Sequence, residues 1–479
     1  MSSTILMNKW VKILCPALFL VLRFSDASPA TIQGHEPDYA GEKLIFNIYT
    51  DPVTKDEKEL FEINIDKNGN FKSDINVSST VYCHSEFDTY EGLLILEPSS
   101  ILTLRLPKKQ VKTALQSKNP YFQPVVIWLV VESDQKNEVN YLVEKLEDTY
   151  ARLTAKYFNQ LYLQRSGLYV DSVRTTLEKE FGGYSQPVFR DQLNFKLKLL
   201  QADVNELSQK SIFKGVRPNN SIWTNPAFTE LLNLVFDNKL SFEANAIGGG
   251  ELRNAVNNGN VEFIKNFFIK KYELDPGLAD LVLLKLLYEG YYSNNFSKPA
   301  IISMLGNKLF SDNPDNNIRI MATNIKKKLL YLSPGSAAPV ICLNDLAGQQ
   351  HCSGQLHGYK YILFADAEML VCREHLKYLA TIASGFGDKL GIFVVIKYSQ
   401  LKETKDFLTK NDIPGTIVME KPDNRYATEY RVRAYPSAFL LDDENNVILA
   451  PAKNPLDGFQ QQFAAFLRTE QLKKLKNQK

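Results

Sequence analysis

The chain of 479 residues is 44% hydrophobic and 23% charged, and its formal net charge at pH 7 is +2. This composition is ordinary for a globular protein, and the length allows about three domains with ample cores. A net charge near zero lacks the basic excess with which proteins hold nucleic acids or anionic membrane surfaces. We therefore expect neither of these as a partner.

The N-terminus has the pattern of a secretory signal peptide. Two lysines precede an apolar stretch over residues 13–22, and small residues follow at 25–30. This order predicts a signal peptide over residues 1–27, with cleavage after Ala27 or Ala30. The apolar stretch has about half the length of a membrane-spanning helix, so we expect no membrane span after cleavage.

Residues 40–107 have the pattern of a small antiparallel β-sandwich. Short strands are predicted over residues 43–49, 59–65, 71–77, 80–86, 93–96 and 101–106. Between two of them lies the polar turn 66–70, whose residues tolerate positive φ. Asp66, Asn68 and Asn70 resemble the start of a calcium loop, but the later bidentate Glu of such a loop is missing, so we predict a hairpin turn and no metal.

Residues 138–332 have the pattern of a helical domain. Apolar residues recur at three- and four-residue steps from Val139 to Leu161, which predicts one long amphipathic helix. Asp275 and Pro276 form a cap and a first-turn proline before a helix that is apolar nearly all round and therefore buried. Further helices are predicted over residues 189–207, 228–240, 251–272 and 316–332, in a bundle of about seven.

Residues 333–479 change to a mixed pattern after the turn-rich segment 333–339. Strands are predicted over residues 340–344, 349–353, 361–365, 390–396 and 416–419 and in a hairpin over 437–449. Helices are predicted over residues 372–386, 400–411, 424–430 and 459–475. This is the thioredoxin order: a strand, a helix and a strand, followed by a hairpin and a final helix. The whole chain is therefore predicted to be a multidomain α+β protein with a C-terminal thioredoxin-like domain.

Three groups of residues make this C-terminal region similar to the TlpA/ResA type of exported thioredoxin-like thiol-disulfide oxidoreductases. They are Ala338-Pro339 with Leu343-x-Asp345-x-x-Gly348, the strand Tyr361–Ala365, and Tyr430-x-Val432-x-x-Tyr435-Pro436-Ser437-x-Phe439-Leu440-Leu441-Asp442. The resemblance covers about the last 145 residues. The preceding β and helical regions are similar in layout to long envelope proteins of this kind in Bacteroidetes. The resemblance implies export across the inner membrane to the periplasm or cell envelope, and a cis proline at Pro436 that faces the redox cysteines.

The chain departs from this family at the redox motif. Family members carry Trp-Cys-x-x-Cys at the start of the first helix, where this chain has Glu368-Met369-Leu370-Val371-Cys372. Met369 thus replaces the attacking cysteine, and Cys372 is the surviving second cysteine. Thiol-disulfide exchange needs an exposed thiolate and a neighbouring thiol that resolves the mixed disulfide, and a thioether provides neither. We therefore expect dithiol activity to be absent.

Cys372 has three other interpretations. In the simplest interpretation, Cys372 is a small apolar residue of the core. A peroxidatic cysteine would have a threonine three residues earlier, where this chain has Met369. Cys372 and His375 could share a metal, but a second closely spaced pair of ligands is missing. We predict no metal and no cofactor.

Cys342 and Cys352 are predicted to form a disulfide. They lie on the two arms of the hairpin around residues 345–348, where opposed residues come within bonding range. An offset of one residue would place Cys342 opposite His351 instead.

These observations predict an exported thioredoxin-like protein that acts as a binding or scaffolding module. An unknown envelope protein or peptide is expected at a groove between Met369 and Pro436. The alternative is a monothiol oxidoreductase or peroxiredoxin-like antioxidant enzyme that uses Cys372, with Cys342 or Cys352 as the resolving thiol. Whether the protein is an enzyme stays open at this point.

Overall fold

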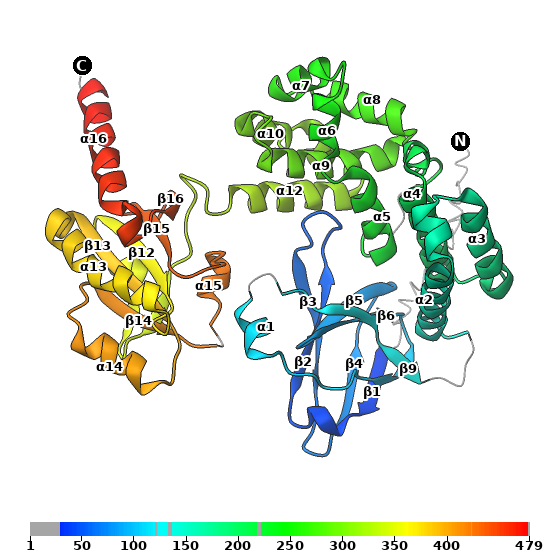
Figure 1. Cartoon of the computed structure of the whole chain (residues 1–479), viewed down its shortest axis with the longest axis horizontal. Helices are drawn as coiled ribbons and strands as arrows, with labels where there is room; N and C mark the ends of the chain where they lie inside the picture. The colour runs from blue at the N-terminus through cyan, green and yellow to red at the C-terminus, as the bar shows by residue number, and fades with distance from the viewer. Residues whose placement is uncertain (1–28, 120–121, 133–136, 218–221, 423, 478–479) are drawn as a thin grey trace, which may run out of the picture.

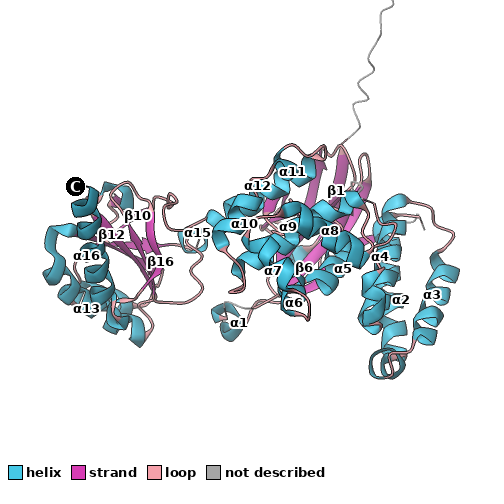
Figure 2. Cartoon of the chain, turned by 90° about the horizontal axis from the view of Figure 1, so that it is seen from above, coloured by secondary structure: helices cyan, strands magenta, loops and turns pink. Residues whose placement is uncertain are grey.

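The computed structural model describes residues 29–119, 122–132, 137–217, 222–422 and 424–477. Two β-sheets pack together below a group of helices, and the C-terminal region forms a separate body at one end (Figure 1). The same separation is visible from above (Figure 2). The predicted signal peptide, residues 1–27, lies outside the described residues. Ala30 is the first residue of strand β1, so cleavage after Ala27 leaves that strand whole.

The first two sheets share one core. One sheet has the order β4-β1-β7-β9 and the other β3-β2-β5-β6-β8. Their strands are β1 (Ala30–His35), β2 (Lys43–Tyr49), β3 (Glu57–Asn64), β4 (Asn70–Ile75), β5 (Val81–Phe87), β6 (Tyr90–Leu96), β7 (Ile101–Arg105), β8 (Val125–Trp128) and β9 (Val130–Glu132), with the short helix α1 (Ala114–Lys118) before β8. The pairs β1–β7 and β6–β8 are parallel, whereas the purely antiparallel pattern was expected. Strands β1, β8 and β9 lie outside the predicted range.

The helical region follows in chain order. It contains α2 (Val139–Lys156), α3 (Gly167–Phe181), α4 (Pro187–Val204), α5 (Pro226–Phe236), α6 (Lys239–Asn245), α7 (Gly250–Asn257), α8 (Val261–Tyr272), α9 (Pro276–Tyr292), α10 (Lys298–Met304), α11 (Lys308–Ser311) and α12 (Asn316–Leu330). Helix α9 is buried nearly all round, and Asp275 accepts a hydrogen bond at its start, as the sequence predicts. Helices α2 to α4 pack against the outer face of the five-stranded sheet through Tyr82 and Ile95.

Two predicted helices are interrupted. The first ends at Lys156, and a π-helical turn (Asn159–Leu163) follows it. The predicted helix over residues 251–272 is two helices, α7 and α8. Gly259 between them has a φ of +70°, a conformation outside the helical range, and Asn260 caps α8 by accepting a hydrogen bond from the Phe263 N–H.

The C-terminal region is built on a five-stranded sheet with the order β14-β13-β12-β15-β16. Its strands are β12 (Tyr359–Ala365), β13 (Leu390–Lys397), β14 (Thr416–Glu420), β15 (Ser437–Leu441) and β16 (Val447–Ala452), and its helices are α13 (Leu370–Phe386), α14 (Lys402–Lys410), α15 (Tyr426–Glu429) and α16 (Phe459–Asn477). Strands β12, β13 and β14 are parallel, and β15 and β16 add antiparallel. A parallel β12-α13-β13 unit followed by an antiparallel hairpin and a terminal helix is a thioredoxin-like fold.

The two faces of this sheet carry different elements. Helices α13, α14 and α16 cover one face, with a core that includes Cys372. The hairpin of β10 (Cys342–Asn344) and β11 (Gln350–Cys352) precedes the sheet in the chain and packs on the other face, together with Tyr430 at the end of α15. None of the described helices has the length and apolar character to cross a membrane.

Helix α12 connects the helical region to both of its neighbours. The Lys328 ammonium group donates to the carbonyl of Thr54 and lies 2.6 Å from the Asp56 carboxylate, at the tip of the hairpin between β2 and β3. The backbone carbonyl of Lys328 accepts a hydrogen bond from Arg431 of the C-terminal region. The Arg431 guanidinium also lies 4.8 Å from the ring centre of Tyr331.

Candidate functional site

Met369, which the resemblance aligns with the attacking cysteine of the family, lies at the start of helix α13. A turn after β12 leads into the helix, because Asp366 accepts hydrogen bonds from the N–H groups of Glu368 and Met369. Met369 is the N-cap residue, and its carbonyl accepts the first hydrogen bond of the helix from Arg373. The Met369 residue is 42% exposed. The position therefore has the exposure that exchange chemistry needs, but it carries a thioether.

Cys372 lies within the core. The residue is 0% exposed, and it packs among the side chains between α13 and the sheet. Burial raises the pKa of the Cys372 thiol, a hydrogen bond with the Asp366 backbone opposes the rise, and the Asp366 carboxylate adds to it. The thiol is therefore protonated at neutral pH, whereas the nucleophile in thiol chemistry is the thiolate.

The loop before β15 lies against the same region. The Tyr435–Pro436 peptide bond is cis, as the resemblance implies. Burial raises the pKa of the Tyr435 phenol to about 12, and the nearby Glu420, Asp366 and Cys372 contribute to the rise. Tyr435 thus brings the Pro436 loop to the residues that surround Cys372. Asp366 was not among the predicted site residues, although its place directly after a buried strand could have indicated it.

Met369, Leu370 and Val371 form an exposed apolar patch at the start of α13. Exposed apolar residues that follow one another are less common than single ones on a soluble protein and mark candidate contact surfaces. Four cavities lie in the N-terminal and helical regions, and neither Met369 nor Pro436 lines any of the four. Whether a groove joins this patch to Pro436 stays a prediction.

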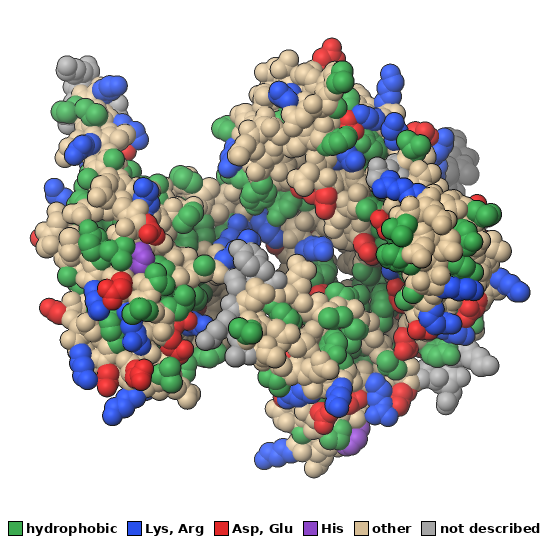
Figure 3. Space-filling model, viewed as in Figure 1, with side chains coloured by type: hydrophobic (Ala, Val, Ile, Leu, Met, Phe, Trp, Pro, Cys, Tyr) green, Lys and Arg blue, Asp and Glu red, His purple; other side chains and the backbone are tan. Residues whose placement is uncertain are grey.

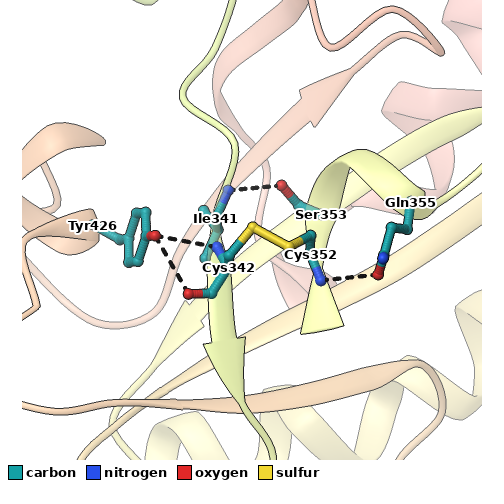
Figure 4. Close-up of a disulfide and its surroundings, with 6 residues drawn as sticks. All are labelled: Ile341, Cys342, Cys352, Ser353, Gln355 and Tyr426. Atoms are coloured by element: carbon teal, nitrogen blue, oxygen red, sulfur yellow. Dashed lines mark hydrogen bonds between the residues drawn. A yellow bond between two sulfur atoms is a disulfide. The ribbon is translucent and has the colours of Figure 1, made fainter. Parts of the chain in front are cut away.

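A disulfide joins Cys342 and Cys352 (Figure 4). The two residues are directly opposed in the β10–β11 hairpin with a Cα–Cα distance of 4.1 Å, and the alternative register with His351 opposite Cys342 does not occur. Tyr426 holds the backbone of Cys342 on both sides: its hydroxyl accepts from the N–H at 3.2 Å and donates to the carbonyl at 3.3 Å. Gln355 accepts a hydrogen bond from the Cys352 N–H.

The sheet separates this disulfide from Cys372. Successive side chains of a strand point to opposite faces, so alternate residues of β12 join different cores. Cys372 belongs to the core on the α13 side. Ile341 and Leu343, which flank Cys342, belong to the core on the other side.

His375, one turn after Cys372, uses one ring nitrogen in a contact with the backbone. Its Nδ1 accepts a hydrogen bond from the Leu456 N–H at 3.2 Å, and burial lowers the pKa of the imidazole, while Asp457 opposes this. His351, a further histidine of the region, lies 3.0 Å from the Asp345 carboxylate. Within the described ranges, no group of three or more histidine, cysteine, aspartate or glutamate side chains is arranged to hold a metal ion.

Comparisons with known proteins add similar structures but no family model. No protein-family model and no curated protein matches the chain. The thioredoxin domain of a thiol-disulfide oxidoreductase from Bacteroides vulgatus is 22% identical over 28% of this chain and 97% of its own length, with a TM-score of 0.26. A thiol:disulfide interchange protein from Bacteroides sp. is 22% identical over 29% of this chain and 92% of its own, with a TM-score of 0.26. A thioredoxin-like protein from Bacteroides caccae is 17% identical over 50% of this chain and 86% of its own, with a TM-score of 0.31.

Proposed function

We propose that this protein is an exported, redox-degenerate member of the TlpA/ResA type of thiol-disulfide oxidoreductases, whose C-terminal domain binds a partner in the periplasm or cell envelope. The observation that carries the proposal is the exposed Met369 at the start of α13, beside a Cys372 that is 0% exposed. Exchange requires a nucleophilic sulfur at the first position and a resolving thiol at the second. The first is absent and the second is buried and protonated.

The binding surface in this proposal is the apolar patch of Met369, Leu370 and Val371, together with the Pro436 loop. In active members of the family, the corresponding surface receives an extended segment of the substrate. An apolar patch beside a loop that Tyr435 anchors retains the means to hold such a segment, because apolar contact does not depend on a reactive sulfur. The partner is an envelope protein or peptide with an apolar side chain for this patch.

The rival function is a monothiol oxidoreductase or peroxidase that uses Cys372. Three observations count against it. The raised pKa of Cys372 lowers the fraction of thiolate, and burial denies a peroxide or disulfide access to the sulfur. Cys342 and Cys352 are bonded to each other on the opposite face of the sheet, so neither is placed to resolve an oxidised Cys372.

Thiol labelling and an activity assay decide between the two functions. The native, oxidised protein should react with maleimide at neither Cys83 nor Cys372, since both are buried, and should react at both after denaturation. The native protein should also fail to reduce insulin disulfides or to consume hydrogen peroxide above the dithiothreitol background. Rapid labelling of native Cys372, or turnover that a Cys372→Ser variant abolishes, would establish the enzyme and reject the proposal.

Export is tested separately. We expect the mature protein in the envelope fraction, with an intact mass that corresponds to a start at Ser28 or Thr31. Retention of Met1 in the purified protein would reject this part of the proposal without affecting the binding function.

A further inference from the structure

A cleft lies between the outer face of the five-stranded sheet and helices α2, α4 and α5. It consists of two adjoining cavities of about 390 and about 500 Å³. Leu93, Val126, Pro226 and Glu230 line both cavities, so the two are continuous. We call this space the β8 cleft, because β8 forms one of its walls. The space-filling view shows the molecule hollowed between the helices and the sheets (Figure 3).

The β8 wall of the cleft is a strand edge with which no other described strand pairs. β8 is the last strand of its sheet, and it pairs on one side with β6. The Val125 N–H donates to the carbonyl of Thr89, directly before β6, and the Leu129 N–H donates to the carbonyl of Leu93 in β6, both at 2.9 Å. Because backbone groups alternate along a strand, the N–H and C=O groups of Val126 and Trp128 point away from β6. Both residues line the cleft, and Val126 is 56% exposed.

The cleft is acidic. Five carboxylates from the sheet and from α2 and α5 line it: Glu91, Glu144, Glu147, Asp148 and Glu230. A sixth, Asp51, is used within its own loop, where it accepts hydrogen bonds from Val53 and Thr54. The two lysines of the lining are Lys55 and Lys196, beside one histidine, His84, and Lys196 lies 2.9 Å from Glu147. In the described part of the chain, Glu144 and Glu230 form no ion pair.

The cleft also contains a buried hydrogen-bond acceptor, on Gln192, for which the described residues supply no donor. Gln192 on α4 is 1% exposed, and its Nε2 donates to Glu147 at 2.9 Å. This hydrogen bond sets the orientation of the amide, since the reversed amide would bring two acceptors together. Among the described residues, the Gln192 Oε1 is buried without a hydrogen-bond partner. An unpaired buried acceptor is costly, so this site favours a ligand that brings N–H donors.

We propose that the β8 cleft binds an extended, basic peptide segment of a partner protein. The segment adds as a strand beside β8, where the backbone groups of Val126 and Trp128 pair with it, and its lysine or arginine side chains lie between Glu144 and Glu230. This mode combines hydrogen bonds from the strand edge with charge complementarity. It is independent of the patch at α13, because all of its residues precede the thioredoxin-like region.

Intrinsic fluorescence reports on this cleft directly. Besides Trp10, the chain has the tryptophans Trp128 and Trp223, and each lines one of the two cavities. In the mature protein, which lacks Trp10 after the proposed signal cleavage, titration with a ten-residue peptide of alternating lysine and threonine should change the emission and saturate. A peptide of alternating glutamate and threonine is the charge control. We expect it to bind at least tenfold more weakly.

Variants of the cleft test the two contributions separately. Glu230→Gln and Glu144→Gln should each weaken the lysine peptide about three- to fivefold, the effect of one exposed charge pair, and added salt should weaken it further. Glu403→Gln on α14, an exposed glutamate remote from the cleft, is the matched control and should leave binding unchanged. A lysine peptide that is N-methylated at alternate residues, which blocks strand pairing without changing the protein, should bind at least tenfold more weakly.

Three results would overturn the proposal. Equal binding of the acidic and basic peptides would remove the charge complementarity. Equal binding of the N-methylated peptide would show that strand pairing is not used. Saturable binding of spermidine alone, with no binding of either peptide, would assign the cleft to small organic cations instead.

Discussion

Restoring one sulfur nucleophile should restore part of the redox chemistry. In Met369→Cys, the new thiol lies at the N-cap of a 17-residue helix, three residues before Cys372 and on the same face. The helix N-terminus stabilises a thiolate by about 0.3–1 kcal/mol, which lowers a thiol pKa by about 0.2–0.7 units. The neighbouring Glu368 opposes this with about 1 kcal/mol of repulsion for a separation near 4 Å in water. The two effects nearly cancel, so we expect an ordinary thiol pKa and slow but measurable exchange.

The assay is insulin-disulfide reduction with dithiothreitol recycling at pH 7. The wild-type protein should be inactive and Met369→Cys active. Adding Glu368→Gln should increase the rate about two- to fivefold, because the helix contribution is then unopposed. The control Met369→Cys with Cys372→Ser should trap a mixed disulfide without turnover. A folded Met369→Cys that stays inactive although its thiol titrates normally would refute the reasoning, because more than the nucleophile would then be missing.

Three further predictions concern the framework around the site. Asn140→Leu should destabilise the contact between α2 and the sheet, because it removes the hydrogen-bond partner of the buried N–H and C=O groups of Ile95. Each unpaired group costs about 1–3 kcal/mol of stability. Denaturant unfolding and amide exchange at Ile95 measure this cost. The C-terminal region should lose stability as the pH falls below about 6.5. Burial lowers the pKa of His375 in the folded state from 6.5, so the unfolded chain binds more protons at acidic pH. A series of unfolding curves at different pH values measures this loss of stability. Non-reducing peptide mapping should find Cys342 bonded to Cys352.

Each of these has a matched control. Asn254→Leu replaces an exposed asparagine on α7 and should cost little, so an equal loss in both variants would contradict the role of Asn140. The pH step should disappear in His375→Asn, and its persistence would assign it to another group. Cys83 and Cys372 should appear as free thiols in the peptide map. A disulfide that includes either of them would contradict the structure.

Local sequence patterns predicted the order of helices and strands in the C-terminal region. The predicted bounds differ from the observed ones where the sequence gives no clear start or stop signal. The apolar run over residues 361–365 identified β12, which extends two residues further toward the N-terminus. The start of α13 was placed two residues late, because Met369 provides no side-chain cap and Leu370 and Val371 are apolar although they are exposed. Gly259 divides a continuous helical pattern, since a single glycine is not sufficient to predict a break.

The candidate sites were predictable to different degrees. The cis proline at Pro436 followed from the family resemblance, and the cysteine replacement at Met369 stays a prediction from the same resemblance. The burial of Cys372 followed from its place one turn into a helix. The β8 cleft had no local signal, because its residues come from strands and helices that are far apart in sequence, such as Glu91, Gln192 and Glu230. Only the packing of the sheet against the helices brings them together.

The contacts of Lys328 and Arg431 affect how this protein can be divided for experiments. The chain pattern changes at Ser333, and a fragment that begins there would appear to be a natural unit. Such a fragment would lose both partners of Arg431, the Lys328 carbonyl and the Tyr331 ring. It would also lack Lys328, whose ammonium group contacts Asp56 in the hairpin between β2 and β3. The change of sequence pattern at Ser333 therefore does not coincide with a boundary between sets of contacts. Truncations for binding studies should retain α12.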